Sequence, residues 1–383
     1  HKAADVPAVY SGGWYDPFAV ATTHQFATMA ARSKTPQKLI MGPWTHNGMR
    51  TGATSAGDVD FGPHASFGTA VYNQQRLRWF DRWLKDIHNG AEHDPPVQIF
   101  VMGGGDGKRN AQGRLNHGGA WRQEVSWPLS HAEAHSYYLR ADGRLTLEAP
   151  VEDEGPLSYT HNPAWPVPTI ASNVTALSRL EKLVEGSDWI PPRDRMTPLV
   201  INGGGHQKEA PEHMGARTPF PLLADRPDVL VFQTDLLQAS VEITGVITVV
   251  LVMSSTAVDT DLTAKLLDVY PPSEDYPAGY HLNLSDSIIR ARYRHGFDRA
   301  RMLTPGKITC VSLLLPPTSN LFKSGHRIRL DIASSNFPKY DVNPGTGEPL
   351  GRHTRTITCS NTLYMGPRWR SRIEVPVVKP KLG

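Results

Sequence analysis

The sequence predicts an α/β segment followed by an all-β domain. Near the amino terminus, apolar strand-like runs alternate with a helical pattern, which is typical of a parallel sheet. After residue 95, short β-prone runs are separated by Pro, Gly, Asn and Asp, as in a β-sandwich. A chain of 383 residues has room for two domains with a sizeable core. We therefore place the first domain at residues 1–94 and the second at residues 95–383.

The first segment begins with a strand–helix–strand pattern. Residues 6–10 are a mostly apolar run that ends at two glycines, as expected for a buried parallel strand that stops at a tight loop. A helical pattern covers residues 18–32, and residues 38–42 form a second apolar strand that enters a Gly-Pro loop. Asp16 and His46 each follow one of the strands. Both therefore fall at the carboxyl ends, where the loops of an open α/β sheet converge on a crevice.

Asp16 and His46 are the candidate catalytic residues. The 30 positions between them allow one crossover helix, so neighbouring parallel strands could bring the carboxylate within hydrogen-bond reach of the imidazole. In a serine hydrolase, such a carboxylate fixes the tautomer of the histidine that takes the serine proton. Each residue also has a structural interpretation. Asp16 precedes Pro17 and suits a helix cap, and His46 is one of 16 histidines, most of which are expected to be structural or exposed.

A longer helix is predicted over residues 71–88. Apolar side chains recur in it at helical spacing, and we expect this stripe to pack in the core beside His46 while basic residues form the solvated side. The stripe consists of Leu77, Phe80, Leu84 and Ile87, and the basic side of Arg76, Arg78, Arg82 and Lys85.

The β-prone runs that follow are spaced as in a sandwich or jelly roll. An irregular insert interrupts them at about residues 161–226. The predicted strands cover residues 97–102, 134–139, 229–233, 243–253, 263–269, 288–293, 307–315, 328–334 and 355–364.

Several of these segments resemble the cocaine esterase and X-prolyl dipeptidyl-peptidase family of α/β-hydrolases. Trp14-Tyr15-Asp16 and Gly42-Pro43-Trp44-Thr45-His46 are similar to the Asp and His motifs of that family. The similarity runs from about Val9 to Pro376 and takes in residues 78–85, 96–103, 255–261 and 325–332. It implies the C-terminal part of an α/β-hydrolase sheet, followed by a jelly-roll, galactose-binding-like domain. It also implies that Asp16 and His46 are the acid and base of a Ser-Asp-His triad.

No residue of the chain matches the nucleophile of the family. The sequence contains no Gly-x-Ser-x-Gly turn, and the triad order of α/β-hydrolases places the serine before Asp16. Ser11 lies inside the loop of the Asp strand, and residues 64–68 come after His46. We therefore expect the nucleophile and oxyanion hole on an N-terminal segment or separate chain, which would make this chain an incomplete, inactive fragment. The alternative is a degenerate relative that no longer catalyses.

Two function classes follow from these residues. The first is a serine-type acyl hydrolase acting on a small ester or amide, with ester hydrolysis, β-lactam acylation and X-Pro dipeptide release left open. The second is a non-catalytic binding or assembly protein built on the β-sandwich. An oligomer is compatible with either class.

Composition excludes several other classes. The net charge of +3 comes from residues spread along the chain, so no basic stripe indicates a nucleic-acid partner. No run of about 18 apolar residues predicts a membrane span, and the compartment, cytoplasmic or exported, stays open. We expect no cofactor and no metal. Cys310 and Cys359 are predicted to be buried free thiols, with a disulfide as the alternative.

Four smaller clusters favour structural roles. Residues 203–205, three glycines, predict a flexible surface loop rather than a phosphate-binding turn. His206 with Glu209 supplies only two metal donors. Asp259 and Asp261 could line a sugar or calcium site but are interpreted as turn residues. The alternating arginines suit one exposed strand face; they are Arg290, Arg292, Arg294 and Arg299.

Overall fold

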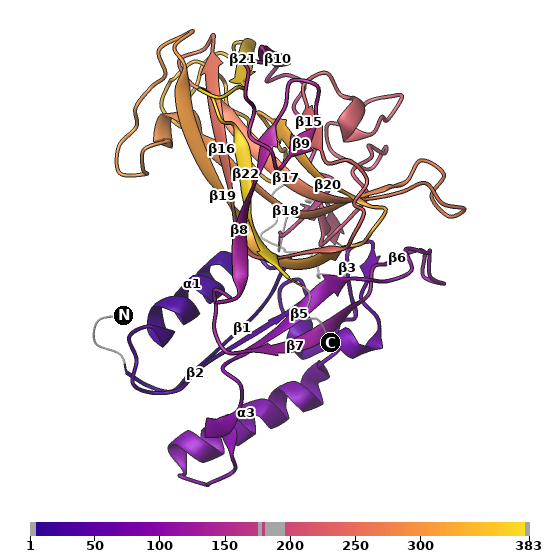
Figure 1. The fold of residues 1–383 in the computed structure, drawn as a ribbon, viewed down its shortest axis with the longest axis vertical. Coiled ribbons are helices and arrows are strands. Elements are labelled where there is room, and N and C mark those ends of the chain that lie inside the picture. The colour runs from indigo at the N-terminus through magenta and orange to yellow at the C-terminus, as the bar shows by residue number, and fades with distance from the viewer. Residues whose placement is uncertain (1–4, 175–177, 181–195, 380–383) are drawn as a thin grey trace, which may run out of the picture.

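The computed structural model describes residues 5–174, 178–180 and 196–379. Figure 1 shows a β-rich part above a smaller part that contains the main helices. The smaller part consists of β1 (Ala8–Gly13), α1 (Ala19–Ala30), β2 (Gln37–Gly42), α2 (Gly48–Thr51), β3 (Ser55–Ala56), β4 (Val59–Asp60), η1 (Pro63–Ala65), α3 (Gly68–Leu84) and η2 (Ala91–His93).

The chain continues through β5 (Val97–Gly103), β6 (Leu115–Asn116) and β7 (Gly119–Glu124), which also lie in the smaller part in Figure 1. The next elements are β8 (Ala132–Leu139), β9 (Leu145–Thr146), β10 (Pro156–His161), β11 (Ala171–Ser172), β12 (Ser178–Leu180), β13 (Met196–Pro198), β14 (Ile201–Asn202) and η4 (Leu223–Asp225). The remaining elements are β15 (Leu230–Gln233), β16 (Val241–Ser255), β17 (Asp261–Tyr270), β18 (Tyr280–Arg290), η5 (Ala291–Tyr293), β19 (Thr309–Phe322), β20 (Arg327–Ala333), β21 (Cys359–Tyr364) and β22 (Arg372–Val378).

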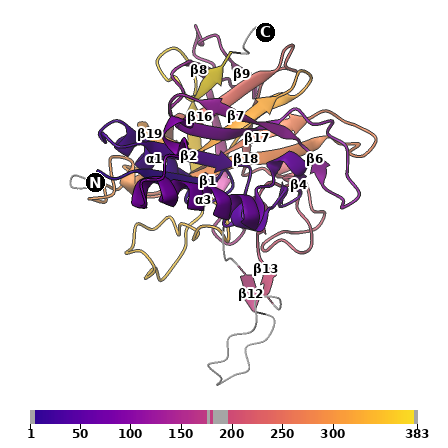
Figure 2. The same cartoon turned by 90° about the horizontal axis from the view of Figure 1, so that it is seen from below.

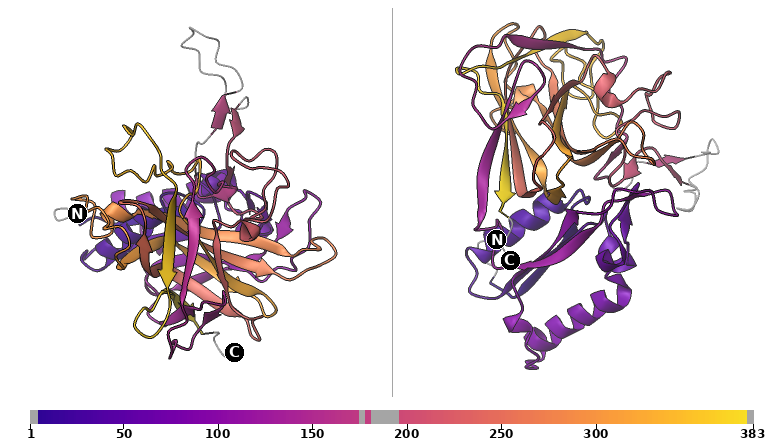
Figure 3. Two further views of the ribbon diagram at one scale, coloured as in Figure 1. Left: turned by 90° about the horizontal axis from the view of Figure 1, so that it is seen from above. Right: turned by 45° about the vertical axis from the view of Figure 1, so that its right-hand side comes forward.

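The strand–helix–strand unit at the amino terminus is confirmed. β1 and β2 pair in parallel from Ala8 opposite Gln37 to Gly13 opposite Gly42, so the two strands end at the same level. Phe26 and Met29 of α1 are buried, and α1 and α3 lie on opposite faces of these strands (Figures 1 and 3). The matched strand ends bring the two following loops together.

One sheet continues from this unit into the β-rich part. Its order among the described residues is β1-β2-β5-β19-β16-β22-β8-β9, with β7, β10 and β21 attached at the side. β5 pairs in parallel with both β2 and β19, so it joins the two parts of the chain through backbone hydrogen bonds. A second sheet, in the order β15-β20-β17-β18, shares one hydrophobic core with the first.

Most predicted strands are present, but the run at 288–293 is only partly a strand, and β7, β10 and β22 were not predicted. The predicted strand at 288–293 ends at Arg290, and the next three residues form η5. β22 was not predicted, although it lies between β16 and β8. Its Pro376 sits where the β16–β22 pairing is interrupted, and its ring occupies the space that a side chain on Gly245 would fill. Bulges of this kind are where a sheet tolerates proline.

Three expectations about burial are wrong. Cys310 is exposed, and only Cys359 is buried. Arg292 is buried on η5 rather than on an exposed strand face. The three glycines at 203–205 are also buried. A side chain on Gly203 would collide with the backbone of Ala56 and Gly57, and one on Gly205 would lie 2.8 Å from the Ala171 side chain.

The stripe on α3 is likewise not in the core. Leu77, Phe80, Leu84 and Ile87 are exposed, and Trp79 is the buried residue of the helix. The apolar spacing correctly predicted the helix, but it did not show whether another part of the chain covers the apolar face. In the right panel of Figure 3, α3 lies at the end of the molecule farthest from the β-rich part.

The predicted insert at 161–226 contains only short elements in its described part. Residues 175–177 and 181–195 of the insert lie outside the described residues. In the described ranges, no helix is long and apolar enough to cross a membrane.

Candidate active site

Asp16 and His46 meet at the carboxyl ends of β1 and β2. The Asp16 Oδ2 atom lies 3.1 Å from His46 Nδ1, which is hydrogen-bond distance. The Asp16 side chain is 9% exposed and the His46 side chain is 43% exposed. A buried carboxylate therefore faces one ring nitrogen, while the imidazole itself reaches solvent.

The second oxygen of Asp16 holds the turn that precedes α1. Asp16 Oδ1 accepts a hydrogen bond from the Phe18 backbone N–H at 2.9 Å, and the Asp16 carbonyl accepts one from Ala19 N–H. The carboxylate thus holds this turn and contacts His46 at once. The predicted helix-cap role of Asp16 is wrong, because the N-cap of α1 is Phe18 and no side chain caps the helix. The orientation of the carboxylate is set by the backbone, which leaves Oδ2 directed at the ring.

The loop that carries His46 is anchored by Trp44. This indole is buried and donates to the carbonyls of Ala53, at 3.1 Å, and Ala65, at 2.9 Å. A Cβ on Gly42 would lie 2.4 Å from the indole ring, and one on Gly13 would lie 1.9 Å from the Trp44 carbonyl oxygen. Both glycines are therefore needed for the close approach of the two loops.

The aromatic residues before Asp16 anchor its loop to distant strands. Trp14 donates through Nε1 to the Phe100 carbonyl at 2.7 Å, and the Tyr15 hydroxyl donates to the Asn283 carbonyl at 3.2 Å. Burial raises the pKa of Tyr15 far above its ordinary value. The Tyr15 hydroxyl is consequently a structural donor.

A small cavity of about 170 Å³ adjoins the pair. Ser11, Gly12, Tyr72 and the residues around His46 line it. The His46 Nε2 atom makes no hydrogen bond with any residue that the structure describes, so this nitrogen is available to another group. The Phe18 ring, 56% exposed, lies 5.4 Å from the His46 ring. The sequence assigned Phe18 only to the start of a helix, and its place next to Asp16 in the loop was the signal for a role at the site.

The other candidate clusters are held by protein groups. His206 Nδ1 accepts the His281 backbone N–H at 2.9 Å, and Glu209 forms an ion pair with Arg226 at 2.6 Å. In the part of the chain that the structure describes, no three His, Cys, Asp or Glu side chains are grouped as metal ligands. His206 and Glu209 thus have structural partners.

Two protein-family models match most of this chain. Residues 89–374 match the X-Pro dipeptidyl-peptidase C-terminal non-catalytic domain, and residues 1–48 match the X-Pro dipeptidyl-peptidase S15 family. The cocaine esterase of Rhodococcus sp. (strain MB1 Bresler) is 31% identical over 97% of this chain and 56% of its own length. The chain belongs to the cocaine esterase and X-Pro dipeptidyl-peptidase family.

Other known proteins and solved structures match a similar extent of the chain. A Mycobacterium bovis protein named as a serine esterase is 27% identical over 97% of the chain and 50% of its own length. An α-amino acid ester hydrolase has a TM-score of 0.74 at 27% identity, covering 97% of this chain and 55% of that one. An aminopeptidase from a marine sediment archaeon, Thaumarchaeota archaeon, shares the fold with a TM-score of 0.74 at 24% identity, covering 98% and 56%. The chain thus spans about half the length of these proteins.

Proposed function

We propose that this chain supplies the acid and base of a serine-type acyl hydrolase. The supporting observation is the 3.1 Å contact between Asp16 Oδ2 and His46 Nδ1, in a histidine whose side chain is 43% exposed and whose Nε2 bonds no described residue. In this arrangement, His46 would take the proton of a serine as it attacks an ester or amide carbonyl. Asp16 would hold the reactive tautomer and stabilise the imidazolium. The proposed substrate is a small ester or amide, with no cofactor.

The nucleophile, in this proposal, comes from a segment or chain beyond the 383 residues. β1 is the first strand in the sheet order, and its Val9 side chain is 40% exposed. A groove of about 380 Å³ runs between β1, β2 and α3, and it shares Ser11, Met49 and Tyr72 with the cavity beside His46.

The exposed side of α3 adds apolar side chains near this groove, whose lining also includes Lys38, Arg76 and Asp94. Leu77 is 58% exposed, Phe80 46% and Leu84 77%. Figure 2 shows α3 in front of β1 and β2, so one covering segment could contact both the strand edge and the helix. Large contiguous apolar surfaces usually mark an interaction site. We infer that the nucleophile-bearing segment covers this surface and places its serine near His46 Nε2.

The proposed architecture of the β-rich part is a jelly roll. Support comes from the two sheets that share one core and from the alternating burial along β19. The proposed domain boundary remains near residue 94, just before β5 begins.

The test is turnover of a p-nitrophenyl ester by a complete enzyme that contains this chain. Asp16→Asn keeps an oxygen for the Phe18 N–H but loses the carboxylate, so the fold should survive while kcat falls by about 10⁴-fold. The kcat of His46→Ala should be lower by a similar factor. His88→Ala, which changes an exposed histidine after α3, is the matched control and should retain activity.

A fluorophosphonate probe tests the missing nucleophile separately. The complete enzyme should be labelled on a serine outside these 383 residues. In the p-nitrophenyl ester assay, full turnover by a complete enzyme with His46→Ala would show that His46 is not part of the mechanism. Absent labelling in a folded, complete protein would favour the binding or assembly function instead.

A further inference from the structure

A second cavity, of about 700 Å³, lies in the β-rich part. It is formed by the end of β18, by η5 and by loops between residues 337 and 356. It shares no lining residue with the cavity beside His46. Its volume is in the range of small-molecule sites.

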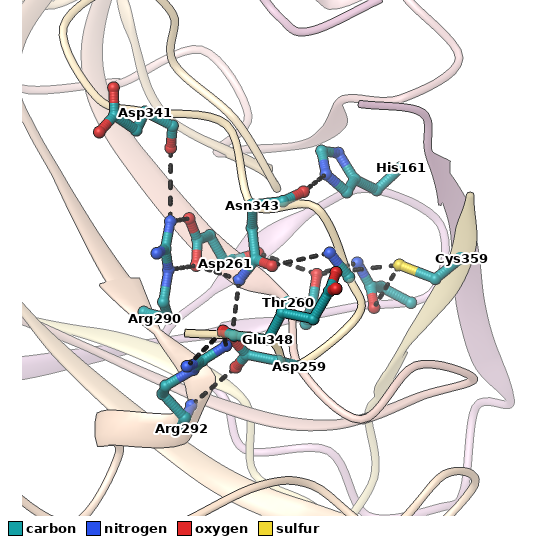
Figure 4. A network of polar contacts seen from close by, with 12 residues as sticks. His161, Asp259, Thr260, Asp261, Arg290, Arg292, Asp341, Asn343, Glu348 and Cys359 are labelled. Carbon is teal, nitrogen blue, oxygen red and sulfur yellow. Dashed lines mark hydrogen bonds and ion pairs between the residues drawn. The ribbon is translucent and has the colours of Figure 1, made fainter. Parts of the chain in front are cut away.

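A buried polar network adjoins this cavity (Figure 4), and Asp261, Arg290 and Arg292 belong to both. Arg290 donates to both oxygens of Asp261, at 2.9 and 3.0 Å, and Arg292 donates to Asp259 at 2.7 Å. Asn343 Nδ2 bridges the two carboxylates, at 2.7 Å from Asp261 and 3.0 Å from Asp259. Each buried carboxylate is thereby paired with a guanidinium. Because each carboxylate is neutralised by an arginine, Asp259 and Asp261 are not available to bind calcium.

Arg290 presents a fixed hydrogen-bond donor to the cavity. Its side chain is 20% exposed, and Nε and Nη2 are held by Asp261. The third nitrogen, Nη1, has no hydrogen-bond partner among the described residues. Nη2 also lies 3.5 Å from the Asp341 carbonyl oxygen, whereas the Asp341 carboxylate points away from the guanidinium in Figure 4. A donor and an exposed acceptor thus lie near each other on the cavity wall.

Aromatic rings form another side of the cavity. The Tyr293 and Phe297 rings lie 5.9 Å apart at 36°, and Phe297 is 82% exposed. Leu350, 50% exposed, also lines the cavity. A ring this exposed contributes little to the core, but its face is available to a flat apolar surface of a ligand.

We propose that this cavity binds a neutral carbohydrate, with the C–H face of a sugar ring on Phe297 and hydroxyl groups at Arg290 Nη1 and Asp341. A sugar hydroxyl can both donate and accept a hydrogen bond, so hydroxyl groups can pair with the Arg290 donor and with the Asp341 acceptor. Anionic ligands fit less well, because Asp341 and Glu348 also line the cavity and neither forms an ion pair with a described residue. Organic cations are disfavoured by the N–H groups of Arg290. The proposal does not depend on the hydrolase function.

The test is binding of maltohexaose, cellohexaose and chitohexaose to the full chain, followed by saturation-transfer NMR and calorimetry. At least one should bind, and Phe297→Ala should weaken it by about 3- to 10-fold through the lost ring face. Phe80→Ala, an exposed phenylalanine on α3, is the matched control and should bind as the parent does. Asp341→Asn removes the charged acceptor and should also weaken binding.

Benzoate distinguishes a carboxylate site from a sugar site. A carboxylate site at Arg290 would bind benzoate, and Asp341→Asn would strengthen that binding by removing a nearby negative charge. That result would overturn the proposal. So would failure of all three oligosaccharides to bind, or equal binding by Phe297→Ala.

Discussion

Asp16 uses its two carboxylate oxygens for two different contacts. Oδ1 accepts the Phe18 N–H at the start of α1, and Oδ2 faces His46. Asp16 is not the cap of α1, whose N-cap is Phe18, but its contact in the preceding turn orients the carboxylate toward His46. The residue types and their positions after two strands were enough to predict the pair. The position of Phe18 close to Asp16 placed it near the site, but the contact of its ring with His46 was not predicted, since it depends on how the two loops turn.

Two histidines near the start of β18 are held in the neutral form. His206 Nδ1 accepts the His281 N–H, and His281 Nδ1 lies 3.0 Å from Arg329 Nη1. Burial lowers the pKa of His206 to about 4 and that of His281 to about 3. The unfolded chain protonates these rings below about pH 6.5, whereas the folded chain does not, so the free energy of unfolding should fall as the pH drops from 6.5 towards 4.

His281→Asn tests this pH dependence, because the Asn oxygen can replace Nδ1 as acceptor but cannot titrate. Urea unfolding between pH 7 and 4.5 should show a shallower loss of stability in the variant, by up to about 1.4 kcal/mol per pH unit. His88→Ala, an exposed position, should keep the parental slope. An unchanged slope in His281→Asn would mean that its ring is protonated in the folded chain.

Helices and strands were predicted by their apolar periods, but their partners were not. The spacing of Leu77, Phe80 and Leu84 places them on one face of α3, and a period carries no information on what covers that face. β22 was missed because Pro376 argues against an interior strand unless a bulge is known. The bulge depends on Gly245, about 130 residues earlier in the chain.

The exposed face of α3 gives a prediction for the helix. Leu84→Lys should change the unfolding free energy of this chain by no more than about 0.5 kcal/mol, because Leu84 is 77% exposed. Trp79→Ala, at the buried position of the same helix, should cost about 3 kcal/mol or more. Denaturant unfolding of both variants measures the contrast. A large loss in Leu84→Lys would show that this face is covered in the chain as it stands.

At the scale of the molecule, the sequence predicted an α/β part and a β-rich part but not their connection. β5 joins β2 to β19, and pairings between strands so distant in sequence leave no local pattern. The contacts of Trp14 with Phe100 and of Tyr15 with Asn283 are long-range in the same way. Local sequence patterns therefore located the candidate site, whereas the long-range hydrogen bonds that hold its loops could be identified only from the structure.

This shared sheet predicts that the two parts unfold together. A single core extends from Trp14 in the first part to Val378 in β22, and the backbone of β5 pairs on both sides. Chains with two separate domains usually unfold in more than one step. Here, hydrogen exchange in β2 and in β17 should report the same free energy of opening.

Phe100→Ala, which truncates a buried side chain of β5, should lower both values by about 3 kcal/mol or more. The surface variant Phe297→Ala should lower neither. Earlier exchange in β2 alone would show that the sheet is continuous in structure but divided in stability, so the Asp16–His46 loops could open while the β-rich part stays folded.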